Sequence, residues 1–129
     1  FRIFVSPDSH QPICIDEWES VGPGRGVFGK KANGFADPNT IMLNKMKCHT
    51  VLPYWAIGPY DEGRGSDRLI FDHLQAHYRW RGTGKATSFY TFTESDALHG
   101  DRLKMFRTRG IERVTDAAGR PQYVRVSEP

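Results

Sequence analysis

Changes in the spacing of hydrophobic and polar positions along the chain predict a series of short strands and helices. Residues 1–5 are mostly β-branched or aromatic, and turn-forming residues follow at 6–9, which predicts a strand that ends there. Residues 13–20 fit either a short strand or a helix. Residues 22–36 are rich in glycine, and we expect a loop there.

The middle of the chain predicts two helices separated by an irregular loop. Asp37 followed by Pro38 is typical of a helix start, and we expect a short helix from there to about Lys47. Prolines and glycines among aromatic residues predict a packed loop over 51–65, after which a serine caps a helix over 67–80. The hydrophobic residues available for burial are Ile41, Met42 and Met46 in the first helix and Ile70, Phe71, Leu74 and Tyr78 in the second.

The last third of the chain predicts a strand that leads into a helix, followed by a hairpin. Residues 87–93 have strand-forming side chains, and the serine that follows them predicts a helix over 96–109. Residues 111–115 and 122–127 have the pattern of a closing hairpin. Because strands and helices follow one another without a regular alternation, the chain predicts an α+β fold with small mixed or antiparallel sheets and flanking helices.

The composition predicts a single globular domain over residues 1–129. Of these residues, 38% are hydrophobic and 26% are charged, which suits a folded core and excludes a disordered chain. No stretch is apolar enough to span a membrane, so we expect no membrane partner. The net charge of +3 is spread along the chain, which does not argue for a nucleic-acid partner, and we expect a monomer. The longest basic cluster, expected to form a solvated helix face, comprises Arg102, Lys104, Arg107 and Arg109, with Arg113 beyond it.

The start of the sequence and its two cysteines bear on the cellular compartment. The chain begins in an apolar run without an initiator methionine, which indicates that an upstream segment was removed, and a secretory signal is the ordinary explanation. Cys14 and Cys48 fit one disulfide in an oxidising compartment. Two buried thiols are the alternative, and the sequence leaves both open.

Several motifs are too weak to indicate a function by themselves. Residues 24–29 match a dinucleotide-binding glycine pattern, but no strand before them and no helix after them is predicted, so we interpret them as a loop. His73 and His77 lie four residues apart on a predicted helix, yet no third ligand is specified and we expect no metal. No serine elbow occurs, and the scattered histidine, glutamate and arginine residues leave a ribonuclease-type toxin as an alternative.

A distinctive order of residues runs through the predicted elements. Arg2 lies on the first strand, residues 6–9 follow it, residues 71–73 lie on a helix, and residues 91–93 form Thr-Phe-Thr before the next helix. This order resembles the ADP-ribosyltransferase family, whose enterotoxin branch has an arginine on its first strand and Ser-Thr-Ser on a later one. It is also similar to uncharacterised fungal domains believed to share that fold.

The resemblance implies an NAD site between the two strands. The arginine would hold the diphosphate, because a guanidinium presents a planar pair of donors to phosphate oxygens. The threonines would position the catalytic carboxylate and the sugar, and a neighbouring aromatic ring would support the nicotinamide. The residues implied in cofactor binding are Arg2, Tyr90, Thr91, Phe92 and Thr93.

The resemblance does not extend to the catalytic acid. The enterotoxin branch has a Glu-x-Glu pair on a late strand, whereas that spacing occurs in this chain at Glu17 and Glu19, far too early. Glu112 and Glu94 are the remaining weak candidates. A missing carboxylate removes the main stabilisation of the positively charged transition state, so we expect a catalytically degenerate protein that needs no cofactor.

The resemblance therefore implies a secreted fungal effector that acts in virulence, enters host cells and binds a host protein. Exposed aromatic residues with arginine are typical of protein interfaces, and we expect Tyr54, Trp55 and Tyr60 to contact the partner. The alternatives are an active NAD-dependent mono-ADP-ribosyltransferase toxin and a small ribonuclease-type toxin.

Overall fold

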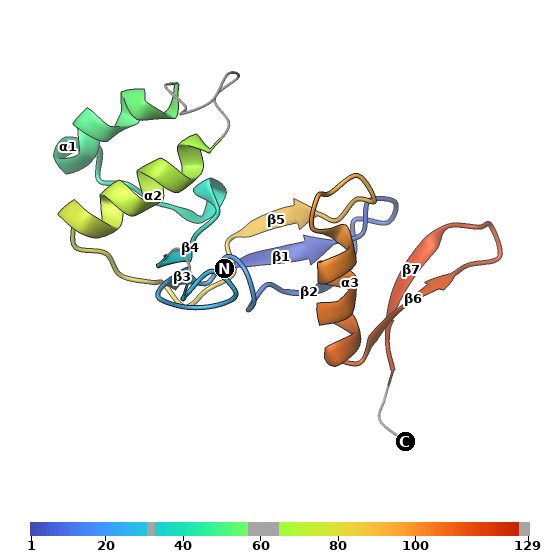
Figure 1. Cartoon of the computed structure of the whole chain (residues 1–129). Helices are drawn as coiled ribbons and strands as arrows, with labels where there is room; N and C mark the ends of the chain where they lie inside the picture. Colours follow the sequence, from blue (N-terminus) through green and yellow to red (C-terminus); the bar gives the residue numbers. More distant parts are fainter. Residues whose placement is uncertain (31–32, 57–64, 127–129) are drawn as a thin grey trace. The chain divides into compact units, whose positions relative to one another are not determined.

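A computed structural model describes residues 1–30, 33–56 and 65–126, which form an α+β protein with small sheets (Figure 1). The predicted α+β class is therefore confirmed. The chain divides into two compact units: unit 1 contains residue 1 and residues 17–85, and unit 2 contains residues 2–16 and 86–129. In the described residues, no helix is long and apolar enough to cross a lipid bilayer.

Unit 2 contains a three-stranded sheet built from distant parts of the sequence. Its central strand β1 (Arg2–Val5) lies antiparallel to β2 (Pro12–Ile15) and parallel to β5 (Ser88–Thr91). Phe4 pairs with Tyr90 in the parallel register. The strand with the N-terminal arginine and the strand that ends at Thr91 are thus neighbours, as the resemblance implied. The predicted strand over 87–93 is shorter than predicted, and Thr93 lies beyond its end.

Aromatic side chains fill the core of unit 2, where α3 (His99–Thr108) packs on one face of the sheet. Phe4, Phe92 and Phe106 are at most 1% exposed. Their rings meet edge to face, with centroids 5.0 to 6.2 Å apart. Such pairs add a preferred orientation to the burial of hydrocarbon, so these rings fix how α3 lies on β1.

The closing hairpin is present as predicted, while the helix before it is shorter than predicted. β6 (Ile111–Thr115) pairs with β7 (Pro121–Arg125), and Tyr123 brings its ring within 5.6 Å of Phe92. Residues 94–98 form turns instead of the first helical turn. Asp96, predicted to open the helix, instead lies before it, and its side chain contacts Tyr90 on β5 and Arg102 on α3.

Unit 1 packs short helical segments against one longer helix. α2 (Ser66–His77) contacts the 3₁₀ helix η2 (His49–Trp55), which follows α1 (Lys45–Cys48) (Figure 1). Ile70 on α2 and Val51 on η2 are both 1% exposed and belong to the core of this unit. The predicted second helix is confirmed, although it contains Ser66 and ends before Tyr78, whose backbone is extended.

The prediction of a single helix from Asp37 to about Lys47 is wrong. The chain instead forms the 3₁₀ helix η1 (Pro38–Thr40), an extended segment over 41–44, and then α1. Asp37 caps η1 as predicted, but Asn44 accepts hydrogen bonds from the first backbone amides of α1 and starts a separate helix. The expected burial of the methionines is also wrong: Met42, in the extended segment, is 90% exposed, and Met46, on α1, is 86% exposed.

The glycine-rich segment is a folded loop between two short strands, β3 (Gly22–Pro23) and β4 (Gly34–Phe35). The amide of Gly24 donates to the Asn33 carbonyl, so it is already used within the loop. Gly26 has φ +68°, and a Cβ there would lie 2.3 Å from the carbonyl oxygen of Trp18. Gly26 is explained by close backbone packing and Gly24 by its positive φ of +68°, which agrees with the loop interpretation.

The two cysteines lie in different units, Cys14 on β2 and Cys48 on α1, and no disulfide joins them. Cys48 is buried and Cys14 is half-buried. The predicted disulfide is therefore not part of this structure.

Candidate functional site

The residues predicted to bind NAD lie close together in unit 2, but they do not share one accessible surface. Arg2 is 3% exposed and Phe92 is 1% exposed. Thr91 is exposed, whereas Tyr90 and Thr93 are half-buried. β1 and β5 thus bring the backbone of these residues together, while the guanidinium and one of the two candidate rings face the interior.

The guanidinium of Arg2 makes a buried ion pair. Its Nε donates to Asp16 Oδ2 at 2.8 Å, and the two side chains are 4% and 0% exposed. The same guanidinium carbon lies 4.3 Å from the ring centroid of Tyr90 and 5.1 Å from that of Phe4. A phosphate would have to compete with the Asp16 carboxylate for this arginine.

A second buried arginine comes from the basic cluster that was expected to be solvated. Arg102 is 5% exposed, so that prediction is wrong for this residue. Its Nη1 lies 2.8 Å from Asp96 Oδ2 and 3.2 Å from the Tyr90 hydroxyl, to which it donates. Its guanidinium carbon also lies over the rings of Tyr90 and Phe4, at 4.8 and 5.5 Å from their centroids. Helix periodicity explains the burial, because residues 102, 105 and 106 lie on one face of α3.

Tyr90 joins these groups. Its hydroxyl donates to Asp96 Oδ1 at 2.6 Å and accepts from Arg102. Burial raises the pKa of Tyr90 above its ordinary value, and the hydrogen bond to Asp96 raises it further, while Arg102 acts in the opposite direction. A neutral phenol that bridges two charged side chains is suited to holding a core together.

The raised pKa of Tyr90 predicts a pH dependence of stability. The folded state holds the phenol proton more tightly than the unfolded chain, so the free energy of unfolding should fall as the pH rises above about 10. In Tyr90→Phe this contribution is absent, and we expect a shallower fall between about pH 9 and 11. Urea unfolding of both proteins across that range measures the difference, and identical slopes would contradict the assignment.

The two weak candidates for the catalytic acid lie on the surface of unit 2. Glu94 is exposed and makes an ion pair with Arg113, and Glu112 is exposed on β6. The Thr93 hydroxyl shares a hydrogen bond with Ser95 at 3.0 Å. The structure therefore gives neither glutamate a contact with a buried arginine, as buried Asp16 and half-buried Asp96 have.

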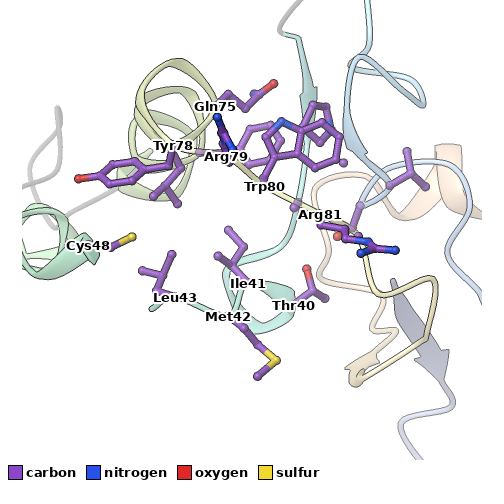
Figure 2. A pocket seen from close by; sticks show the side chains of 18 of the residues that line it. Thr40, Ile41, Met42, Leu43, Cys48, Gln75, Tyr78, Arg79, Trp80 and Arg81 are labelled. Atoms are coloured by element: carbon purple, nitrogen blue, oxygen red, sulfur yellow. The ribbon is translucent and has the colours of Figure 1, made fainter. Parts of the chain in front are cut away.

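Unit 1 contains a groove of about 750 Å³, which is within the usual range for binding sites. The extended segment 41–44 forms one wall, and the end of α2 with the following segment 78–82 forms another. Figure 2 shows Ile41 and Leu43 directed toward the wall of Tyr78 and Trp80, with Met42 turned away from it. The walls are thus mainly apolar.

The charges around this groove all have one sign. Four cationic side chains line it, and none of the described lining residues is Asp or Glu. Within the described part of the chain, these four cations are exposed and make no ion pair. They are Arg25, Lys47, Arg79 and Arg81.

Sequence reasoning missed this groove, although one local signal was available. Arg79, Trp80 and Arg81 follow α2 as a basic and aromatic alternation, and Trp80 is 59% exposed. Of the residues expected to contact a partner, Tyr54 is 54% exposed and Trp55 is half-buried, both on η2. The remaining predicted contact residue, Tyr60, lies outside the described residues.

The histidine pair on α2 forms a small aromatic cluster on the surface of unit 1. The rings of His73 and His77 lie 4.4 Å apart, and Tyr54 and Tyr78 each lie 6.2 Å from His73. Among the residues that the structure describes, no group of three or more potential ligands surrounds them. The pair therefore has ring neighbours but no third metal ligand within the described chain.

Comparisons of the chain with protein-family models, curated proteins and solved structures found no match.

Proposed function

We propose that the protein is a secreted effector-type protein that acts by binding a host protein, on an ADP-ribosyltransferase-like scaffold that has lost catalysis. The observation that supports binding is the groove of unit 1, which combines apolar walls with four cations free of carboxylate partners in the described chain. Exposed arginine and aromatic side chains of this kind contribute most of the energy at many protein interfaces. Fungal origin and a role in virulence belong to the same proposal.

The arrangement of unit 2 supports the loss of catalysis. In this proposal Arg2 stabilises the core through Asp16, and its buried guanidinium is not free to hold a diphosphate. Glu94 and Glu112 lie on the surface, where a carboxylate is well solvated and stabilises a developing positive charge weakly. The second candidate function, NAD-dependent transfer, draws its support from the parallel pairing of β1 with β5.

A direct test separates these two functions. We expect titration calorimetry to detect no saturable binding of NAD up to millimolar concentration, and we expect no release of nicotinamide. The physical reason is that binding would have to break the buried Arg2–Asp16 pair. Nicotinamide release that disappears in Glu94→Gln or Glu112→Gln would overturn the proposal, and cleavage of RNA by the same preparation would favour the ribonuclease alternative.

A further inference from the structure

We infer that the groove of unit 1 binds an extended segment of the partner protein in which Asp or Glu residues flank large apolar side chains. This inference rests on the proposed function, and it specifies the chemistry of the partner at the groove. Three features of the groove lead to it: the shape of its walls, their apolar character and their charge.

The shape of the walls favours an extended partner. The segment 41–44 is extended, and its side chains at positions 41 and 43 face the groove while Met42 turns away (Figure 2). The opposite wall also continues without helix or turn over residues 79–83. An extended peptide has the same two-residue repeat as the segment 41–44, with alternate side chains about 6.5 Å apart, so it can match that wall and lie along the opposite one.

The apolar walls need hydrocarbon from the partner. Ile41 and Leu43 are half-buried on one side of the groove, and Trp80 is 59% exposed on the other. Covering such side chains removes apolar surface from water, which favours binding. A purely acidic segment would leave that apolar surface exposed to water, so the partner must also carry large apolar side chains.

The charge of the groove selects carboxylates. Arg79 and Arg81 precede and follow Trp80 in the sequence, and all three residues line the groove, so the wall that offers apolar surface also carries two cations. Arginine binds carboxylates through paired donors, and these two have no carboxylate partner in the described chain. Acidic residues beside an apolar anchor therefore complement this wall.

A single-stranded nucleic acid would also be attracted to four cations, but the walls favour a peptide. Bases bind such channels by stacking on flat aromatic faces. Here the wall formed by Ile41 and Leu43 is aliphatic, and Val21 and Leu74 extend the aliphatic lining. Branched aliphatic groups bury other side chains well and offer no face for stacking, so this wall, unlike the one with Tyr78 and Trp80, cannot hold a base by stacking.

Selection from a displayed library of random ten-residue peptides on the full chain tests this inference. We expect the enriched peptides to combine Asp or Glu with Leu, Ile, Phe or Trp at alternate positions. Labelled with fluorescein, the consensus peptide should bind at least tenfold more weakly to the double variant Arg79→Glu, Arg81→Glu and to Trp80→Ala. A control variant with the same change of charge, Lys30→Glu with Arg107→Glu, alters exposed residues that do not line the groove and should bind as the parent does.

Several outcomes would overturn the inference. These are an absence of enriched peptides, enrichment of basic or uncharged peptides, or equal loss of binding in the control variant. Binding of a twelve-nucleotide oligouridine that the Arg79 and Arg81 changes abolish, without peptide binding, would make the groove a nucleic-acid site. Sedimentation showing a dimer that the same changes dissociate would make a second copy the occupant. Turnover of NAD, by contrast, would refute the proposed function itself, so the two failures are distinguishable.

Discussion

Asp16→Asn is expected to lower the free energy of unfolding by about 3–5 kcal/mol, because it removes the carboxylate that compensates a buried guanidinium. The Asp16 side chain is 0% exposed and Arg2 is 4% exposed, so water cannot replace the lost charge. Loss of one partner of a buried pair costs far more than the pair contributes, since the other charge stays in a medium of low dielectric constant. Urea unfolding followed by far-ultraviolet circular dichroism measures the loss.

Two further variants test whether burial is the cause. Asp101→Asn removes an exposed ion pair with Lys104, whose side chains are 55% and 77% exposed, and should cost no more than about 0.5 kcal/mol. Arg2→Met combined with Asp16→Leu removes both buried charges and should recover much of the stability that Asp16→Asn loses. An Asp16→Asn protein as stable as Asp101→Asn would show that the pair is open to solvent.

The distribution of tryptophan helps to locate the loss. Trp18, Trp55 and Trp80 all belong to unit 1, whereas Asp16 belongs to unit 2. Tryptophan fluorescence therefore reports the unfolding of unit 1, while circular dichroism reports both units. If Asp16→Asn lowers the urea midpoint seen by circular dichroism and leaves the midpoint seen by fluorescence unchanged, the loss of stability belongs to unit 2.

The same ion pair changes how the family resemblance is interpreted. The arginine that suggested a diphosphate site is on the predicted strand, and that strand lies beside the threonine strand as expected. What the pattern could not show is the partner of the guanidinium, because Asp16 is fourteen residues away, in a segment that fitted either a short strand or a helix. An arginine on a strand has the same sequence signature whether it binds a ligand or supports the core.

Elements with a strong local signal were predictable from the sequence. The strand over residues 1–5, the helix α2 and the closing hairpin each have a clear hydrophobic period and turn residues at their ends. The prediction of one helix after Asp37 is wrong because the segment contains two capping residues. Asp37 caps the 3₁₀ helix η1, and Asn44 caps the separate helix α1, so that residues 41–44 between them are extended. Local spacing alone does not decide between one helix and two.

The groove depends on the same segment, because the extended residues 41–44 form one of its walls. A continuous helix to about Lys47 would have placed Ile41 and Met42 on a buried face, and it would have removed the extended wall. Only the tertiary structure brings residues 41–43 opposite residues 78–80, which are far away in the sequence. The alternation of arginine and tryptophan at 79–81 could have indicated a binding segment, but nothing local identifies the opposite wall.

Phe92→Ala is expected to lower the free energy of unfolding by about 3–5 kcal/mol, the usual loss when a buried phenylalanine leaves a cavity. Its ring is 1% exposed, stacks on His99 with centroids 4.6 Å apart, and meets Phe106 at 5.0 Å. These neighbours lie on α3, whose position on the sheet is fixed partly by Phe92, so the cavity should not close easily. Thermal and urea unfolding both measure the loss.

Phe89→Ala provides a matched control from β5. Phe89 is 73% exposed, so its truncation should change stability by no more than about 0.5 kcal/mol. The comparison also tests the role that the resemblance implies for residue 92. A ring that supports nicotinamide at a surface would lose NAD binding on truncation with little loss of stability, whereas a core ring loses stability whether or not NAD is present. A stable Phe92→Ala protein would therefore refute the burial of this ring and restore the cofactor interpretation.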